Sequence, residues 1–387
     1  MDHRPCLFFS VTLGFLAPSA AALLEYFKKR IPEKISSMTP PKPKKPKAFK
    51  LLKLPWVALE EVLKPMENRD VFMLSLCSKN TSNILITFKL KANLYYIVRD
   101  YDLSVYSLQD NGHRDLIFSI ECIYYIKHWV DNEQNIIRLT IGGMDVQCLW
   151  KGDGIKYYYT TNSEALEQAL DNHIHQLFTA EYIVLEDSRF DHCYKKYPNL
   201  SKVTDLYIWY IRESHFKYIM EKYPNLKSFR TKGSIDEQMT DCSKLLNVDY
   251  VFIGRCYYSR PLYLRENFNG RFLDLSGARI HANDVLNFVK SWISGKKYFN
   301  LEVFFASNVD LKINFALISD ELKILAKKWD RPTVYEYWSR ATERNGREKI
   351  DLSGSEYKAF MDFERKTDQK MATLMLSDFK FAFIVWN

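Results

Sequence analysis

The side chains able to act as acids, bases or nucleophiles are scattered along this chain and match no catalytic motif. His192 and Cys193 are adjacent, but a nucleophile and its base meet in space and seldom as sequence neighbours. His173 and His175 lie two apart on an expected helix, which directs them to nearly opposite faces and disfavours a shared metal ion. We therefore expect no catalytic residue and no cofactor.

Cysteine and glycine spacing points to no metal or nucleotide site either. The seven cysteines are odd in number and include no C-x-x-C pair, which suits a reducing compartment and disfavours zinc. Gly152-Asp153-Gly154 lacks the third glycine, or the Lys-Ser/Thr step, of a phosphate-binding loop. We expect a simple turn there.

The net charge of +8 is concentrated at the amino end. Of 55 basic and 47 acidic side chains, ten and three lie in residues 1–50, which leaves 45 and 44 for the remaining 337 residues. A fold that grips phosphate backbones carries clustered positive charge on its own surface. The balance argues against nucleic acid as a partner, while 47% hydrophobic and 15% aromatic residues indicate globular domains.

The first 48 residues divide into a hydrophobic segment and a linker. Residues 5–24 carry no charge and approach the length of a membrane span. If they insert, Lys28-Lys29-Arg30 and everything after them stay in the cytosol. A signal peptide, a non-native extension and a merely hydrophobic tail are the alternatives. Residues 28–48 interleave prolines with lysines, so we expect an extended, solvated spacer.

Two amphipathic helices are predicted between residues 49 and 86. Leu54-Pro55 opens the first, because proline favours the first helical turn, and Pro65 ends it. Asn68 is the expected N-cap of the second helix, which ends near Ser78. So short a pair cannot bury all its apolar surface internally. The pattern therefore predicts a partner, either another domain of this chain or a second protein. The apolar positions of the two helices are Leu59, Val62, Leu63, Met66, Val71, Leu74 and Cys77.

This stretch resembles an F-box, the module that docks F-box proteins onto the Skp adaptor of cullin-type ubiquitin ligases. The resemblance is carried by the Leu54-Pro55 opening, the apolar stripe, the Asp70-Val71 step and the close at residues 74–79. It implies that the helices bind the adaptor by apolar burial. The expected contact residues are Leu54, Pro55, Leu59, Val62, Leu63, Met66, Val71, Leu74 and Cys77.

Residues 93–160 alternate in the manner of β-strands and are expected to form antiparallel hairpins. An extended run at residues 93–110 is followed by the turn Asn111-Gly112 and by a second run from Asp115. Residues 136–141 and 144–149 flank Gly142-Gly143, a two-residue hairpin signal. Residues 163–178 then predict a helix.

Residues 181–330 contain a degenerate repeat. The segment Lys-Tyr-Pro-Asn-Leu at 196–200 recurs at 222–226, and residues 297–301 echo both. Intermediate copies are placed at 247–251 and 271–275. A period in the twenties with an Asn-Leu-led strand predicts a leucine-rich-repeat-like solenoid, although a non-repetitive α/β layer stays open.

Residues 281–306 carry a second resemblance, to the type 2 F-box-associated domain expanded in nematodes. The matching positions are Phe288, Trp292, Ile293, Gly295, Asn300, Leu301 and Glu302, and we expect the aromatic pair to be core packing. The chain then returns to strands, at 362–366, 370–376 and 379–386.

The sequence thus predicts a mixed α/β protein. Its parts are a hydrophobic segment with a linker (1–48), a helical F-box (49–92), hairpins and a helix (93–180), a repeat-like region (181–330) and C-terminal strands (331–387). The expected function is substrate recognition in a Skp–cullin–F-box ubiquitin ligase, which acts by proximity and supplies no catalytic group. The alternative is a membrane-tethered interaction scaffold. We expect cytoplasmic location, with the nucleus or a membrane-anchored form as alternatives, and the substrate is a protein of unknown identity.

Overall fold

The structure is a computed structural model of the 387-residue chain. It describes residues 51–386 except 100–101, 110–112, 123–135, 152–153, 160–162, 188–199, 201, 210–212, 235–242, 256–261, 279, 308–313, 329, 331, 333, 340–345 and 352–356. The hydrophobic segment, the Lys/Pro-rich linker, the Asn111-Gly112 turn, Gly152-Asp153 and the His192-Cys193 pair lie outside these residues. No helix of the described part has both the length and the apolar character that a bilayer crossing needs.

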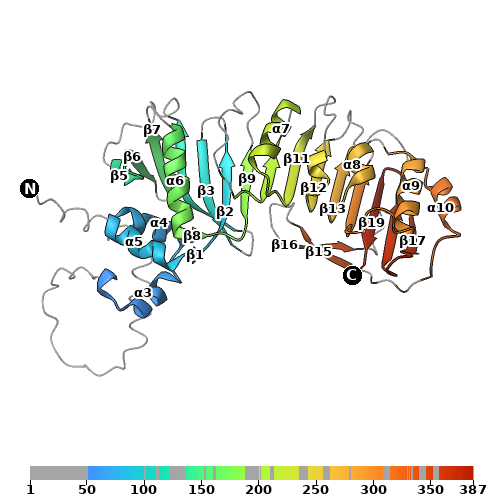
Figure 1. The fold of residues 1–387 in the computed structure, drawn as a ribbon, viewed down its shortest axis with the longest axis horizontal. Helices are drawn as coiled ribbons and strands as arrows, with labels where there is room; N and C mark the ends of the chain where they lie inside the picture. The colour runs from blue at the N-terminus through green and yellow to red at the C-terminus, as the bar shows by residue number, and fades with distance from the viewer. Residues whose placement is uncertain are drawn as a thin grey trace, which may run out of the picture.

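An elongated sheet runs through the molecule from end to end (Figure 1). Fifteen of the described strands belong to it, in the order β17-β18-β19-β14-β13-β12-β11-β10-β9-β2-β3-β4-β7-β6-β5. The strands are β2 Asn93–Val98, β3 Asp102–Leu108, β4 Arg114–Cys122, β5 Ile136–Ile141, β6 Met144–Lys151, β7 Gly154–Tyr159, β9 Ile183–Asp187, β10 Asp205–Ile208, β11 Ser228–Ser234, β12 Tyr250–Arg255, β13 Phe272–Ser276, β14 Val303–Ser307, β17 Ala359–Glu364, β18 Met371–Leu376 and β19 Lys380–Val385. Two pairs stand apart: β1 Leu90–Lys91 with β8 Phe178–Thr179, and β15 Val334–Ser339 with β16 Gly346–Asp351.

The centre of the sheet is parallel and its two ends contain antiparallel hairpins. Strands β2 and β9 to β14 pair in parallel, and β9 to β14 follow one another in chain order. Parallel neighbours need a crossover, commonly a helix. The predicted C-terminal strands join the same sheet, because β19 pairs antiparallel with β14. One sheet therefore crosses every predicted boundary between residues 93 and 387.

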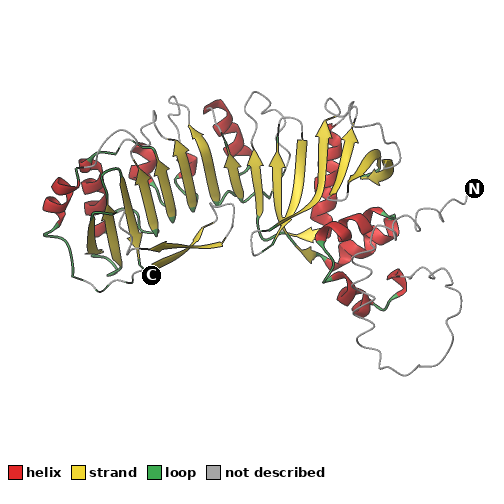
Figure 2. Ribbon diagram, turned by 180° about the vertical axis from the view of Figure 1, so that it is seen from behind, coloured by secondary structure: helices red, strands yellow, loops and turns green. Residues whose placement is uncertain are grey.

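Helices cover one face of this sheet. Figures 1 and 2, which view the molecule from opposite sides, show the helices in front of the strands in one and behind them in the other. The helices are α3 Trp56–Leu63, α4 Asn68–Leu76, α5 Lys79–Phe88, α6 Ser163–Leu177, α7 Glu213–Lys222, α8 Leu262–Asn267, α9 Ala282–Ile293 and α10 Phe315–Leu322, with 3-10 turns at Leu51–Lys53 and Ser243–Leu245.

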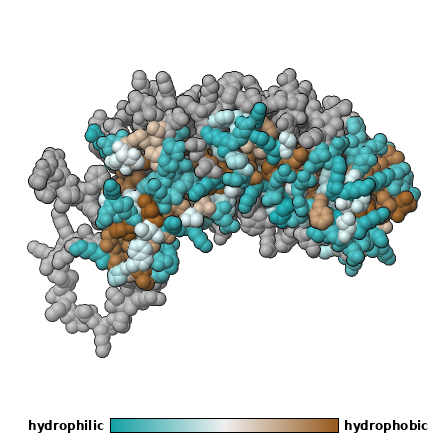
Figure 3. Space-filling model, in the orientation of Figure 1, coloured by the Kyte–Doolittle hydropathy of each residue, from teal (hydrophilic) through white to brown (hydrophobic). Residues whose placement is uncertain are grey.

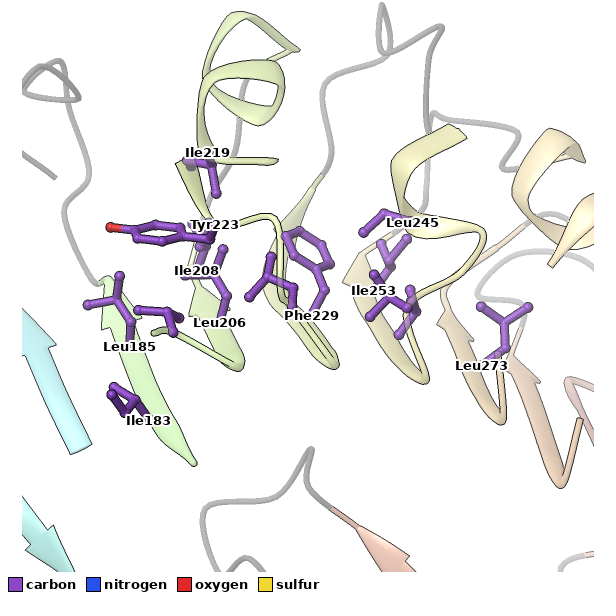
Figure 4. Close-up of a cluster of buried hydrophobic side chains, with 14 of the residues drawn as sticks. Ile183, Leu185, Leu206, Ile208, Ile219, Tyr223, Phe229, Leu245, Ile253 and Leu273 are labelled. Carbon is purple, nitrogen blue, oxygen red and sulfur yellow. The ribbon is translucent and has the colours of Figure 1, made fainter. Parts of the chain in front are cut away.

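The main core lies between the helices and the sheet. Because strand side chains alternate between faces, Leu206 and Ile208 of β10 and Phe229 of β11 point toward helix α7 (Figure 4). Each of the three is 1% exposed or less. Smaller apolar clusters occupy the opposite face, where Tyr335 of β15 packs in one cluster with Tyr250 of β12.

The strand register shows which positions along the parallel strands are equivalent. These are Val203, Leu226, Val248, Gly270 and Leu301, spaced 23, 22, 22 and 31 residues apart. The predicted copy at 247–251 is in register with them, and the copy at 271–275 is two residues late, because its equivalent begins at Asn269-Gly270. The copy at 196–200 is out of register, since its Leu200 comes three residues before Val203, and residues 196–199 lie outside the described part of the chain.

Glycine replaces the repeat's apolar residue at position 270 because nothing larger fits. A Cβ built there would lie 2.1 Å from the main-chain oxygen of Val248 and 2.4 Å from Cζ of Phe268. Asparagines directly precede the last three of these equivalent positions, and hydrogen bonds connect them from strand to strand. Asn269 Nδ2 donates to Asn247 Oδ1 at 3.4 Å, and Asn300 Nδ2 donates to the main-chain oxygen of Asn269 at 3.1 Å.

Other local predictions are confirmed, with one correction. The Gly142-Gly143 hairpin joins β5 to β6, both glycines have positive φ, and the predicted helix at 163–178 is α6. The extended run at 93–110 is instead two antiparallel strands, β2 and β3. Charged residues separate the two strands in the sequence. The alternation of apolar residues does not show that one strand ends and another begins there.

Candidate functional site

Residues 51–88 form three helices, where the sequence predicted two. Helix α3 begins directly after Pro55 and ends at Leu63, so Met66 lies in the following turn and not on the helix. The N-cap of α4 is Glu67, one residue before the expected Asn68. The missed helix, α5, begins after Ser78, whose side chain accepts a hydrogen bond from the main-chain N–H of Thr81 at 3.1 Å. Ser78 is therefore a helix start and not merely a helix end.

The nine expected contact residues differ in how much of each side chain is exposed to solvent. Leu59, Leu63 and Val71 are 1–3% exposed and belong to the main core of the chain. Five more are half-buried. Leu54, Met66 and Leu74 pack against that core, whereas Val62 and Cys77 lie outside it. Pro55 is exposed. Three of the nine residues are therefore covered by the chain itself and offer no accessible surface.

Helix α3 leaves apolar surface uncovered beside these residues. Trp56 and Val57 are 51% and 70% exposed. The Trp56 ring stacks on Phe88 of α5, with centroids 4.1 Å apart and planes 12° from parallel. Figure 3 shows hydrophobic surface gathered over α3 to α5. Neither residue was among the expected contacts. Trp56 precedes Leu59 by three residues and extends the same helical face, so its spacing was the available signal, whereas Val57 lies off that face.

Helix α4 fastens this helical unit to the sheet. Phe72, which is fully buried, stacks on Phe118 of β4 with ring centroids 5.5 Å apart. Ser75 Oγ donates to the main-chain oxygen of Phe72 at 2.5 Å and lies 2.7 Å from Nε2 of His173 on α6. Because the hydroxyl proton goes to the carbonyl, the histidine N–H donates to Ser75. Burial lowers the pKa of His173, so its ring is neutral at pH 7.

A second attachment lies next to the helices. Strand β1, which follows α5, pairs in parallel with β8, which follows α6, through Leu90 opposite Phe178. Helices α5 and α6 are also in contact. The helical unit and the sheet therefore share one continuous core, which fixes their relative orientation.

Because Leu63 is buried, we expect Leu63→Asp to destabilise the helical unit. The substitution places a carboxylate at a 1% exposed position with no cationic partner provided, and burying a charge without a partner is strongly unfavourable. We expect α3 to α5 to unfold, seen as lost hydrogen-exchange protection of the amides in residues 56–88. Leu63→Ala serves as the milder comparison, at about 2–5 kcal/mol. Unchanged protection in Leu63→Asp would contradict the burial argument.

Among the described residues we find neither a metal-binding group nor an activated nucleophile. None of their histidine, cysteine and acidic side chains gather into a group that suits a metal ion. His173 and His175 make separate contacts: His173 meets Ser75, and Nε2 of His175 lies 3.3 Å from Oδ1 of Asp171 on its own helix. Burial raises the pKa of the Cys148 thiol, which keeps it protonated and weakly nucleophilic.

Comparison with known proteins gives one match. Residues 51–93 match the F-box domain family. The match covers the helical unit and the start of β2 and leaves the rest of the sheet unassigned. No curated protein and no solved structure matches the chain.

Proposed function

We propose that this chain is a substrate-recognition subunit of a Skp–cullin–F-box ubiquitin ligase. The single observation that carries the proposal is the F-box match at residues 51–93. The uncovered apolar surface on α3 supports it, because contiguous apolar surface commonly marks a protein interaction site. Such subunits act in the cytosol or nucleus and supply no acid, base or nucleophile. They raise the effective concentration of substrate lysines near the conjugating enzyme.

The proposed adaptor contact has an outer and an inner layer. The exposed and half-buried members of the expected set touch the adaptor, together with Trp56 and Val57. Leu59, Leu63 and Val71 support them from within the core. Each large apolar side chain that becomes covered on binding contributes about 1.5–3 kcal/mol. The contact residues are Leu54, Pro55, Val62, Met66, Leu74 and Cys77.

The substrate is proposed to bind the sheet beyond the F-box. We interpret β9 to β14 as a degenerate leucine-rich-repeat-like solenoid of the F-box-associated type. The 22–23-residue period supports this interpretation, and so does the packing of Phe288 against Phe304 and Phe383 at 4.9 and 5.0 Å. Repeat proteins of this kind present extended surfaces to their partners.

Val62→Asp tests the adaptor contact. Val62 is half-buried and lies outside the main core, so a carboxylate there can remain hydrated while it opposes apolar docking. We expect the full chain to stay folded and to lose co-purification with the Skp adaptor and cullin.

Asn83→Asp is the matched control, since it adds the same single negative charge at an exposed position of α5. Asn83 lies five residues before Phe88, so on the helix it points well away from the Trp56–Phe88 stack. Equal adaptor recovery from both variants would refute the proposed contact, and recovery from neither the variants nor the unmodified chain would refute the proposed function.

A further inference from the structure

Cations and aromatic rings alternate on the sheet face that the helices leave bare. Leu206, Ile208 and Phe229 point toward α7 (Figure 4), so their neighbours Tyr207, Arg230 and Phe252 lie on the opposite face, which is turned to the viewer in Figure 2. These three residues are in register on the adjacent strands β10, β11 and β12. Trp209 directly follows the end of β10, and Lys232 lies two positions after Arg230 on β11. We call Tyr207, Trp209, Arg230, Lys232 and Phe252 the cation–aromatic patch.

Arg230 lies close to two aromatic rings at the centre of this patch. Its guanidinium carbon lies 5.2 Å from the Tyr207 ring centroid and 4.8 Å from that of Phe252. Within the described part of the chain, no side chain or carbonyl accepts a hydrogen bond from this guanidinium, and its Nε is buried without a partner. An arginine that lies beside aromatic rings and whose terminal N–H groups have no acceptor suits a planar oxyanion.

Lys232 adds a second positive charge at the same ring. Its Nζ lies 5.5 Å from the Tyr207 ring centroid and 5.0 Å from that of Trp209. Burial raises the pKa of Tyr207, while Lys232 and Arg230 both act to lower it. The two cations therefore act on one small region of the sheet, with aromatic surface between them.

The two carboxylates beside the patch accept hydrogen bonds from other residues and not from Arg230. Glu186 accepts hydrogen bonds from Tyr95 Oη and from Trp209 Nε1, and it lies 4.0 Å from Arg114. Asp274 accepts a hydrogen bond from Ser276 Oγ at 2.7 Å, and burial raises the pKa of Asp274 to about 6. Asp274 is thus mostly ionised at pH 7, and it lies in register with Phe252 and Arg230 on the same face of the sheet.

We propose that the cation–aromatic patch binds an acidic segment of the substrate protein, with a glutamate or aspartate carboxylate on the edge of Arg230. The identification of the occupant as the substrate rests on the proposed function. A singly charged carboxylate fits better than a doubly charged phosphate, because Asp274 repels the second charge. Apolar side chains of the same segment rest on Trp209 and Phe252.

Direct binding to the full chain, without adaptor, tests this inference. The probe is a fluorescein-labelled peptide of six glutamates, titrated at pH 7.5 and low salt and followed by fluorescence anisotropy, with a hexalysine peptide for comparison. We expect Arg230→Gln to weaken binding about tenfold or more, since a hydrogen-bonded ionic contact is lost. Added salt weakens binding to the unmodified chain. Arg271→Gln is the matched control, because Arg271 already donates to Glu302 at 2.6 and 2.9 Å.

The outcomes separate the site from the ligase assignment. Equal affinity in Arg230→Gln and Arg271→Gln, or no preference for glutamate over lysine, overturns the inference. Tighter binding of a phosphoserine peptide than of hexaglutamate also overturns the carboxylate assignment. Peptide binding that survives in Val62→Asp supports a patch independent of the adaptor contact. If adaptor binding fails in the unmodified chain while the peptide result holds, the ligase assignment falls and the acidic-segment site stands.

Discussion

Replacing Asp368 with alanine is expected to lower the free energy of unfolding by about 3 kcal/mol or more, because it leaves a buried guanidinium without its counter-ion. The Arg365 side chain has no exposed surface, and its Nε and Nη2 donate to the two Asp368 carboxylate oxygens at 2.8 and 2.6 Å. Its Nη1 donates to the main-chain oxygens of Tyr298 and Phe299 at 3.4 and 3.0 Å. This one side chain therefore joins the turn after β17 to the segment before β14.

The loss is best measured as hydrogen-exchange protection of the β17 and β18 amides, since a chain of this size need not unfold in one step. Arg365→Met with Asp368→Ala is the control, and it should be less destabilised than Asp368→Ala alone because no unpaired charge remains buried. A cost below about 1 kcal/mol for Asp368→Ala would contradict this account.

The same pair predicts a dependence on pH. The hydrogen bonds from Arg365 hold the pKa of Asp368 below its usual value of 3.8. A carboxyl whose folded pKa is depressed stabilises the fold above its unfolded pKa and loses that contribution as pH falls through the folded pKa. Protection of β17 in the unmodified chain should therefore fall below about pH 4, and Asp368→Asn should lack that component.

Trp292→Ala is expected to lower the free energy of unfolding by about 3–5 kcal/mol, through the cavity left by the largest fully buried side chain among the described residues. The Trp292 ring meets Phe383 of β19 edge-on at 5.0 Å, and the Arg365 guanidinium lies over it at 5.2 Å. The amides of β19 are the expected site of lost exchange protection.

Trp292→Phe is the informative comparison. The indole Nε1 is buried and finds no acceptor within the described part of the chain, so phenylalanine removes an unsatisfied donor while it keeps much of the ring contact. We expect a cost well below that of alanine. Equal losses from the two substitutions would show that Nε1 has an acceptor or that the ring volume is irreplaceable.

The sequence predicted a local element well where a single local pattern, such as a turn dipeptide or a helical spacing, determines it. The Gly142-Gly143 hairpin and α6 follow from turn chemistry and helical spacing, respectively. Helix α5 was missed because asparagine, serine, threonine and isoleucine have modest helix propensity. Its formation depends on packing Leu85, which is 1% exposed, into a core that the local sequence does not display.

The helical unit was predicted in position, but the depth of its residues was not. Apolar spacing identifies which residues of α3 share a face, but it does not distinguish the residues covered by the chain's own core from those left exposed. Leu63 belongs to the first group and Val57 to the second. The cation–aromatic patch was invisible for a different reason. Tyr207, Arg230 and Phe252 are 23 and 22 residues apart, and only the register of β10 to β12 brings them together.

The contacts of Phe72 and Ser75 with β4 and α6 decide how the helical unit can be removed experimentally. Deletion of residues 51–92 would uncover Phe118 and His173 together with the β8 edge, and newly exposed apolar surface and strand edges favour aggregation. A point change on the outside of α3 leaves those contacts covered, so the role of these helices is better tested by substitution than by truncation.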